Sequence, residues 1–285
     1  MLIVDIVGGL GNQMYCYALY RTLLERDRDV RMNLSFYKTQ YIRSCLRFLP
    51  QVTNRKYLLP QVFNIPQEQK LDVFMGMLAT AAKNLRLGKV CIDEAKGFQP
   101  EVLDMKDGII SGYWQSFKYS EEIRDILRKE FTFRKPLAGK SAEVIDEIRS
   151  CNSVSISVRR DDYLNFGMAL PDEYYTNAMR YIQERVPDAK FFCTSDDIDY
   201  CRNCLRGGGI TFIDWSNGDD QYFDMQVISE CKHNILANST FCTWGAWLNC
   251  NPHPIVIRPN KFTPSVDPGK NRDLWSGEWV SMPAW

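Results

Sequence analysis

The second half of the chain alternates short apolar segments with amphipathic ones, and this alternation restricts its fold more than any other feature. Five segments have the length and residue types of buried strands, and a helical pattern fills each of the four gaps between them. We therefore predict strands at 153–158, 190–194, 210–214, 234–237 and 254–258, with helices at 172–186, 197–205, 220–231 and 240–249. Strands that alternate with helices pair in parallel, so this half is expected to form a doubly wound α/β sheet.

Charged residues stand where the first two of these predicted strands end. Arg159 and Arg160 follow the first strand, and Asp196 and Asp197 follow the second. Because parallel strands bring their carboxyl ends to one edge of a sheet, where open α/β folds bind ligands, we expect these side chains to share a pocket. Two guanidinium groups suit a diphosphate, since each offers planar, bidentate donors, and a carboxylate suits a guanine edge or ribose hydroxyls.

The two arginines also have acidic neighbours in sequence, Asp161 and Asp162, so a surface salt bridge is the alternative interpretation. The end of the fourth predicted strand favours the pocket. There Asn238, Ser239 and Thr240 lead into a helix, and the N-terminus of a helix binds phosphate through its free N–H groups. We therefore predict a nucleotide-diphosphate pocket at this edge of the sheet.

The chain opens with a short apolar run, residues 2–7, followed by a glycine-rich turn and a helical stretch at 14–26. Strand, turn and helix make a Rossmann-like beginning. Met14 replaces the third glycine of a dinucleotide-binding fingerprint, so a nicotinamide site and a plain tight turn are the weaker alternatives. We favour a backbone pressed against a ligand, with amide side chains as hydrogen-bonding groups. This interpretation rests on Gly9, Gly11, Asn12 and Gln13.

The pattern breaks between the two halves, at Pro136 and Gly139, and we place the domain boundary there. The predicted domains are residues 1–140 and 141–285. Before the break, residues 67–87 have helical spacing, with large apolar side chains along one face that we expect to belong to the core. The residues of that face are Leu71, Phe74, Met75, Leu78, Ala82 and Leu85.

Composition excludes several kinds of partner. Basic and acidic residues number 35 each, so no overall field favours nucleic acid or an anionic membrane, and any anion binding must be local. No apolar run approaches the roughly 18 residues that span a bilayer, and no signal peptide is apparent, so we expect a cytoplasmic protein. Cys201 and Cys204 lack a second pair or a histidine at ligand spacing, which argues against zinc. The D-x-D at 197–199 could hold a divalent metal, but we favour a helix cap.

Three blocks of the sequence resemble the bacterial α-1,2-fucosyltransferases, which transfer L-fucose from GDP-fucose to a galactoside. The first block is the G-G-L-G-N-Q-M run at 8–14, and the second is the strand at 154–158 with the R-R-x-D run that follows it. The third and most specific block runs from Cys231 to Leu248, and a shorter middle block fits residues 194–197. The blocks occur in the family's order and span most of the chain.

The resemblance implies a GT-B-like α/β fold, with two Rossmann-type lobes and a cleft between them. It further implies inversion at the anomeric carbon and no required metal or other cofactor. The N-terminal lobe would hold a β-galactoside acceptor, and the C-terminal lobe would hold GDP-fucose. A lipid-linked acceptor would bring the protein into peripheral contact with the inner face of the membrane.

The resemblance also implies roles for particular residues. Arg159 would contact the β-phosphate with support from Arg160, and Asp162 is the first candidate to accept the acceptor's proton or to orient Arg159. Asn12 and Gln13 would lie near the fucose and the acceptor. The catalytic set is therefore Arg159, Asp162 and Asn12, and the donor-binding set is Gly9, Gly11, Gln13, Ser157, Arg159, Arg160, Asp196, Asp197, Asn238, Ser239 and Thr240.

Two positions depart from the family's pattern. Ser157 stands where the family has histidine, and Asp161 stands where it has glycine. Serine loses the reach of an imidazole, and an additional carboxylate beside a diphosphate costs affinity unless it faces solvent or Arg160. Two alternatives therefore remain: a catalytically weak or silent homologue that binds a GDP-sugar or a glycan, and a fucosyltransferase of another linkage.

Overall fold

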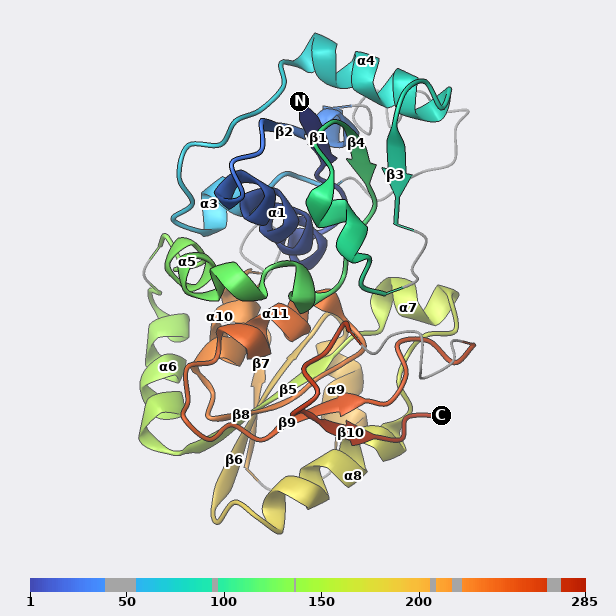
Figure 1. Ribbon diagram of the computed structural model, residues 1–285. Coiled ribbons are helices and arrows are strands. Elements are labelled where there is room, and N and C mark those ends of the chain that lie inside the picture. Colours follow the sequence, from blue (N-terminus) through green and yellow to red (C-terminus); the bar gives the residue numbers. More distant parts are fainter. Residues whose placement is uncertain (39–54, 94–96, 136, 206–208, 217–221, 266–272) are drawn as a thin grey trace. The chain divides into compact units, whose positions relative to one another are not determined.

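The computed structural model describes residues 1–38, 55–93, 97–135, 137–205, 209–216, 222–265 and 273–285. The chain divides into two compact units, unit 1 (Met1–Arg134) and unit 2 (Lys135–Trp285). Each unit is built on its own parallel sheet, with helices packed against it (Figure 1).

Unit 1 contains a four-stranded sheet in the order β2-β1-β4-β3, with every pairing parallel. The strands are β1 (Leu2–Asp5), β2 (Val30–Asn33), β3 (Val90–Ile92) and β4 (Gly108–Ser111). The apolar opening of the chain forms the strand between β2 and β4. Leu2 and Val4 are fully buried there, as expected for a strand whose two edges are both paired.

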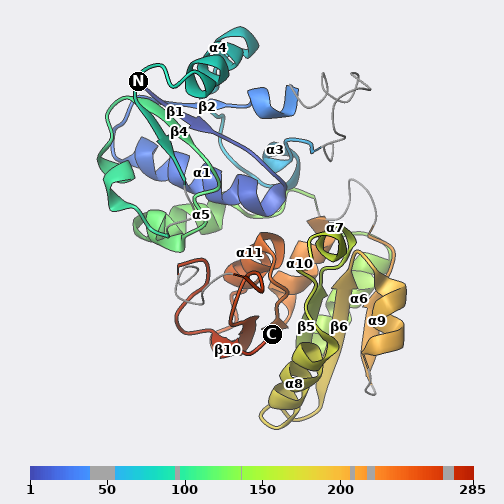
Figure 2. The ribbon, with the colours of Figure 1, turned by 90° about the vertical axis from the view of Figure 1, so that its right-hand side faces the viewer.

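Helices α1 (Leu10–Glu25) and α4 (Val73–Asn84) lie on opposite faces of this sheet (Figure 2). The predicted start of the first helix at residue 14 is wrong. Gly9 takes the N-cap position in extended conformation, so the helix begins at Leu10. Further helices of unit 1 include α3 (Leu59–Val62) and α5 (Arg124–Glu130), with short 3-10 helices at Pro100–Asp104, Phe117–Tyr119 and Glu121–Ile123.

The expectation that the apolar face of α4 belongs to the core is wrong. Phe74 and Leu85 are 66% and 68% exposed, and Leu78 is 47% exposed. The helix instead turns a polar side toward the sheet, where Lys83 Nζ lies 2.6 Å from Asp5 Oδ2 and Thr80 Oγ1 accepts a hydrogen bond from Asn33. The reason is that this face of the sheet ends in polar side chains, which require polar partners when they are buried.

Unit 2 contains a six-stranded sheet in the order β10-β9-β8-β5-β6-β7, again with every pairing parallel. The strands are β5 (Asn152–Val158), β6 (Ala189–Ser195), β7 (Ile210–Ile213), β8 (His233–Ile235), β9 (Val256–Pro259) and β10 (Val280–Met282). The first five coincide with the predicted strands to within two residues at each end, whereas β10 was not predicted. The doubly wound parallel sheet is therefore confirmed.

Helices cover both faces of the second sheet (Figure 1). Phe191 packs into the core on the side of α8, whereas its neighbour Phe192 packs on the side of α6 and α10. Opposite burial of adjacent residues is the signature of a strand that is covered on both faces. The helices of unit 2 are α6 (Lys140–Ser150), α7 (Asp161–Asn165), α8 (Asp172–Gln183), α9 (Ile198–Cys204), α10 (Tyr222–Glu230) and α11 (Thr240–Leu248).

Candidate functional site

The ends of β5 and β6 bring together the four charged side chains that the sequence predicts to meet. The register places Ser157 opposite Thr194 and Val158 opposite Ser195. The two residues after each strand therefore face each other across the sheet edge. We call Arg159, Arg160, Asp162, Asp196 and Asp197 the arginine cluster.

Arg159 is held between two carboxylates. Its Nη2 donates to Asp162 Oδ1 at 2.8 Å, and its Nη1 lies 2.9 Å from Asp196 Oδ2. These bonds use two of the five N–H donors of the guanidinium. The side chain keeps 27% of its surface exposed, and its guanidinium carbon lies 5.6 Å from the centre of the Tyr163 ring. Arg159 is thus oriented from two sides while part of it still faces solvent.

Arg160 is fixed by its backbone and its side chain together. Its N–H donates to Asp196 Oδ1 at 2.8 Å, and its Nε lies 3.2 Å from Asp197 Oδ2. The guanidinium also stacks on the ring of Tyr200, at 3.3 Å from the ring centre. Stacking of this kind stabilises an arginine in one orientation.

The aspartates of the cluster contact protein groups in this conformation. Asp196 bonds to both arginines, and Asp197 Oδ1 accepts a hydrogen bond from the N–H of Tyr200 as the N-cap of α9. The D-x-D is therefore a helix cap at its first position, as favoured from the sequence. The contact of these carboxylates with guanine or ribose stays a prediction. Asp161 is exposed to solvent, and its negative charge still contributes to the raised pKa of Asp196.

Burial and ion pairing shift the pKa values of Asp196 and Arg159. Burial raises the pKa of Asp196 above its usual value, and attraction to Arg159 opposes this only in part. Burial lowers the pKa of Arg159, but attraction to Asp196 and the hydrogen bond that Arg159 donates to Asp162 outweigh it, so the pKa rises overall. Arg159 therefore keeps its positive charge at every pH of interest.

Tyr163 connects the cluster to the corner before α11. Its hydroxyl donates to Asn238 O at 3.1 Å, while its ring lies beside Arg159. Asn238 is fully buried, and its Oδ1 has no hydrogen-bond partner among the described residues. Ser239 Oγ accepts from the N–H of Phe241 as the N-cap, so Thr240 is the first residue of α11. The predicted corner at Asn238, Ser239 and Thr240 is therefore separated from Arg159 by the side chain of Tyr163 alone.

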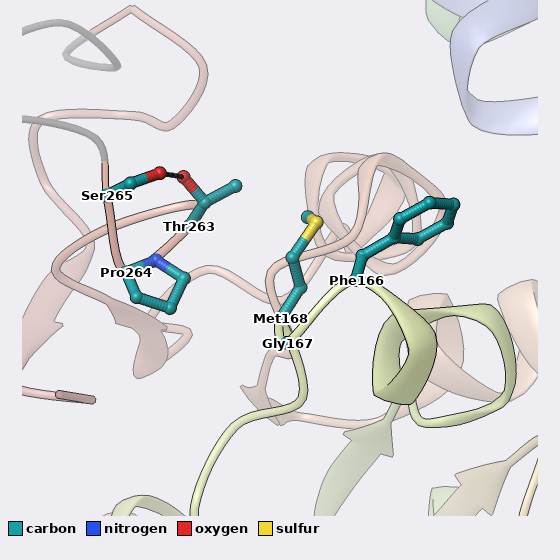
Figure 3. A pocket seen from close by; sticks show the side chains of 6 residues that line it. All are labelled: Phe166, Gly167, Met168, Thr263, Pro264 and Ser265. Carbon is teal, nitrogen blue, oxygen red and sulfur yellow. Dashed lines mark hydrogen bonds between the residues drawn. The ribbon is translucent and has the colours of Figure 1, made fainter.

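An open pocket of about 460 Å³ lies beside this corner. Figure 3 shows that Phe166 and Met168 form one side and Thr263, Pro264 and Ser265 form the other, with Gly167 between Phe166 and Met168 in sequence. The amide of Asn238 ties the two sides together, because its Nδ2 donates to the backbone oxygens of Met168 at 3.0 Å and Phe262 at 2.7 Å. The predicted role of Asn238 in ligand binding is thus accompanied by a bracing role that the sequence does not reveal.

Ser157 is the second-last residue of β5, and its side chain is buried. Its Oγ has no hydrogen-bond partner among the described residues, whereas the equivalent oxygen of Ser155 accepts from Asn234 Nδ2 at 2.9 Å. A buried hydroxyl without a partner is costly and calls for an explanation. A ligand group at the strand end would satisfy it.

The glycine turn of unit 1 is shaped by close contacts. Gly8 has a φ of +81°, and a Cβ at this position would come within 2.8 Å of Asn12 and 3.1 Å of Tyr113. Asn12 Oδ1 accepts from Gln115 Nε2 at 2.9 Å. A Cβ on Gly9 would lie 3.3 Å from Arg55. The turn thus gathers the Arg55 cation, the amides of Asn12 and Gln115, and the Tyr113 phenol. Arg55 is a residue that sequence reasoning missed.

Gln13 lies under the glycine turn. It is fully buried, and its Nε2 donates to the backbone oxygens of Gly8 at 3.1 Å and Lys56 at 2.8 Å. Its Oε1 accepts from the N–H of Leu58 at 2.9 Å. The amide therefore braces the glycine turn, and the contact of Gln13 with a ligand stays a prediction. Gly11 is buried in the first turn of α1.

Tyr163 and Tyr200 are further residues that sequence reasoning missed in unit 2. Tyr163 follows the arginine block directly, which was the available signal, whereas only the fold brings Tyr200 to Arg160. Among the residues that the structure describes, no group of three or more His, Cys, Asp or Glu side chains is placed to hold a metal ion. Within the same ranges, no helix is both long and apolar enough to cross a bilayer.

Comparisons with known proteins add to this geometry. The model of the family described as "Glycosyl transferase family 11" matches residues 2–282. The chain is 30% identical over 279 residues to the Alpha-1,2-colitosyltransferase of Escherichia coli, which covers 92% of each chain. It is 26% identical over 165 residues to the Galactoside alpha-(1,2)-fucosyltransferase 1 of Homo sapiens, which covers 52% of this chain and 45% of the human one.

Among solved structures, the fucosyltransferase NodZ from Bradyrhizobium is similar to this chain, with a TM-score of 0.57 at 13% identity. The match covers 90% of this chain and 94% of NodZ. A NodZ crystal soaked with GDP-fucose matches with a TM-score of 0.51. The likeness confirms the predicted GT-B-like α/β fold with two Rossmann-type lobes.

Proposed function

The chain belongs to glycosyl transferase family 11, and from this premise we propose that it moves L-fucose from GDP-fucose to the 2-hydroxyl of a terminal β-galactoside. The observation that supports this best is the arginine cluster. It offers two oriented guanidinium groups at the carboxyl edge of a parallel sheet, where α/β folds bind nucleotides. Unit 2 would hold the GDP-sugar, and unit 1 would hold the acceptor.

In the proposed reaction the bond between the anomeric carbon of fucose and the β-phosphate oxygen breaks. Negative charge develops on the departing GDP, and Arg159 stabilises it with the donors that its two carboxylate partners leave available. Donors that are already oriented need no reorganisation in the transition state, which is the largest single source of such stabilisation. Arg160 supports the same phosphate, and the N-terminus of α11 at Ser239 and Thr240 adds free N–H groups.

The acceptor hydroxyl attacks from the opposite side of the sugar, so the configuration inverts. Its oxygen forms the new bond to the anomeric carbon, and its proton must pass to a base at or after the transition state. Asp162 is our candidate, and its bond to Arg159 also supports an orienting role. Asn12, with Gln115 and Tyr113 beside it, would contact the acceptor in unit 1.

We propose that no metal takes part. Asp197, the first carboxylate of the D-x-D, already caps α9 through Oδ1 and pairs with Arg160 through Oδ2. The arginines would supply the positive charge that a divalent ion supplies elsewhere. We also propose a cytoplasmic location with peripheral contact at the inner membrane face, where a lipid-linked acceptor is presented.

Product analysis tests the proposal directly. The protein is incubated with GDP-fucose and a panel of β-galactosides, and the linkage of the product is determined by NMR. We expect fucose on the 2-hydroxyl of a terminal galactose. Similarity to a colitosyltransferase supports colitose as the second candidate sugar, so the corresponding colitose donor is compared in parallel. Binding of GDP-fucose without transfer to any acceptor would instead identify a silent homologue.

A further inference from the structure

Helix α4 exposes a wide apolar surface on the side away from its sheet. Phe74, Leu78 and Leu85 lie along the middle of this surface, and each has close to half or more of its area exposed. At about 100° per residue, the apolar positions from 74 to 85 that point outward cover an arc of about 160° without a polar interruption. The residues of this apolar arc are Phe74, Met75, Met77, Leu78, Ala81, Ala82 and Leu85.

The orientation of α4 is fixed by its inner side. Lys83 Nζ contacts Asp5 Oδ2 at 2.6 Å and donates to Ser111 Oγ at 3.1 Å. Thr80 Oγ1 is 2.7 Å from Ser35 Oγ, and a Cβ on Gly76 would come within 2.7 Å of Asn33 Oδ1. Rotating the helix to bury its apolar arc would break this network and leave Asp5 buried without its cation. The arc is therefore held outward by the fold.

Basic residues flank the apolar arc. Between residues 70 and 89 the chain has four basic side chains and one acidic one, Asp72. Lys83 points inward and Lys70 pairs with Glu68 at 2.6 Å, whereas Arg86 and Lys89 are exposed where the helix ends. Apolar side chains next to exposed cations match a bilayer surface that carries anionic headgroups.

We propose that α4 docks this protein on an anionic membrane, lying in the plane of the interface with its apolar arc among the acyl chains. The helix has 12 residues and is about 18 Å long, which is too short to cross a bilayer and suits the in-plane orientation. A fluid interface can surround a convex ridge from every side, and the flanking cations contact the phosphates. The inference deepens the peripheral location proposed above and rests on it, but it needs no assignment of donor or linkage.

Vesicle flotation with the full chain tests this docking surface. Vesicles of phosphatidylcholine containing phosphatidylglycerol are compared with vesicles of phosphatidylcholine alone. We expect binding to the anionic vesicles, and a fall of at least about 100-fold in the partition coefficient for Phe74→Ser/Leu78→Ser/Leu85→Ser. Trp285→Ser, at an exposed aromatic residue elsewhere, is the matched control and should bind as the wild type does.

A second pair of variants separates the charge from the apolar arc. Arg86→Glu/Lys89→Glu should reduce binding to anionic vesicles by at least about 30-fold, since each basic residue at such a surface contributes about 1 kcal/mol. Lys106→Glu/Lys129→Glu, an equal change in charge at two exposed positions outside α4, should leave binding unchanged.

Two results would overturn the proposal. One is wild-type binding no stronger than that of the triple serine variant. The other is a wild-type dimer that the serine substitutions dissociate in light scattering, because the arc would then be covered by a second copy. Transfer to a soluble β-galactoside is measured in the same preparations. Its loss in every variant would indicate failure of the fold or of the proposed function, whereas retained transfer with lost flotation supports the docking surface alone.

Discussion

Both units place charged side chains at the carboxyl ends of their parallel strands, but the two groups differ in how far their side chains are exposed to solvent. This difference indicates which group stabilises the fold and which can bind a ligand. In unit 1, Asp5 accepts hydrogen bonds from Asn33 and Ser111 and pairs with Lys83, and the Asp5 side chain is only 4% exposed under α4. In unit 2, the side chains of Arg159 and Asp162 keep 27% and 32% of their surfaces exposed. We call Asp5 with Asn33, Ser111 and Lys83 the sealed group, and the arginine cluster the open group. Charges that are shielded from solvent stabilise a fold, whereas charges that remain partly exposed can also bind a ligand.

The largest expected effect comes from breaking the open group. Arg159→Ala should reduce fucosyl transfer by at least about 100-fold, the scale of losing one preorganised charge stabiliser. Initial rates with GDP-fucose and a soluble β-galactoside provide the measurement. Arg180→Ala, at a surface position on α8, is the matched control, and near-UV circular dichroism checks the fold. Near-wild-type transfer by Arg159→Ala would refute the phosphate role.

Breaking the sealed group should affect stability instead of turnover. Lys83→Met leaves Asp5 buried without a cation, and we expect a loss of about 3 kcal/mol in the free energy of unfolding. This is the lower end of the range for a buried pair, because Lys83 keeps 20% of its side chain exposed. Urea unfolding measures the change, and transfer per folded molecule should stay close to the wild-type value. A drop in turnover without destabilisation would mean that the sealed group also serves the reaction.

A third carboxylate sharpens the comparison, because Asp224 is partly buried and its Oδ1, which is shielded from solvent, has no partner among the described residues. Burial raises its pKa from 3.8 to about 7. The folded state therefore retains this proton to a higher pH than the unfolded state does. It follows that the stability contributed by neutral Asp224 is present below about pH 4 and is lost as the pH rises toward 7.

Asp224→Asn should remove this dependence. The difference in unfolding free energy between wild type and variant is measured by urea denaturation from pH 4.5 to pH 8.5. We expect the wild type to lose about 2 kcal/mol relative to the variant across this range, a discounted conversion of the shift at 1.36 kcal/mol per unit. A difference that stays constant with pH would show that Asp224 is charged in the folded protein at pH 5.

Two serines on one strand provide a smaller test of the same idea. Ser155→Ala removes an accepted hydrogen bond in the core of unit 2 and should lower the free energy of unfolding by about 1 kcal/mol. Ser157→Ala removes a hydroxyl without a described partner, so stability should be unchanged or slightly higher. If Ser157 contacts the donor, the KM for GDP-fucose should rise by about 2- to 10-fold in Ser157→Ala alone. Equal KM values for the two variants would exclude that contact.

The smallest expected effect is that of chelation. Transfer in excess EDTA should equal transfer in magnesium, because the arginine cluster supplies the positive charge in the proposed reaction. The assay needs a metal-dependent transferase as its positive control. A strict metal requirement would instead assign the D-x-D carboxylates to a cation.

The sequence predicts much of unit 2 and less of unit 1, for a physical reason. Strands buried on both faces give continuous apolar runs, so β5 to β9 and the charged strand ends were predictable from local pattern alone. The partners of Arg159 and Arg160 follow from the register of β5 and β6. Local pattern placed Asp196 and Asp197 at the second strand end, but it did not reveal their ion pairs with Arg159 and Arg160.

Helix α4 shows that local pattern does not predict which side of a helix packs against a sheet. Its periodicity correctly indicated a helix, but which side faces the sheet depends on Asp5, Asn33 and Ser111, which come from three strands distant in sequence. The inward role of Gln13 was missed for the same reason, because its partners lie more than 40 residues away at Lys56 and Leu58. Polar residues inside an apolar helix, such as Thr80 and Lys83, were the available signal.

Calorimetric titration with GDP tests the central claim most directly, because it compares the open and the sealed groups in one assay. We predict that wild type and Lys83→Met bind GDP equally, and that Arg159→Ala binds at least about 10-fold more weakly, since a charge-assisted hydrogen bond contributes about 1.5–3 kcal/mol. Equal GDP affinity in Arg159→Ala and wild type, or no binding by the wild type, would contradict the account.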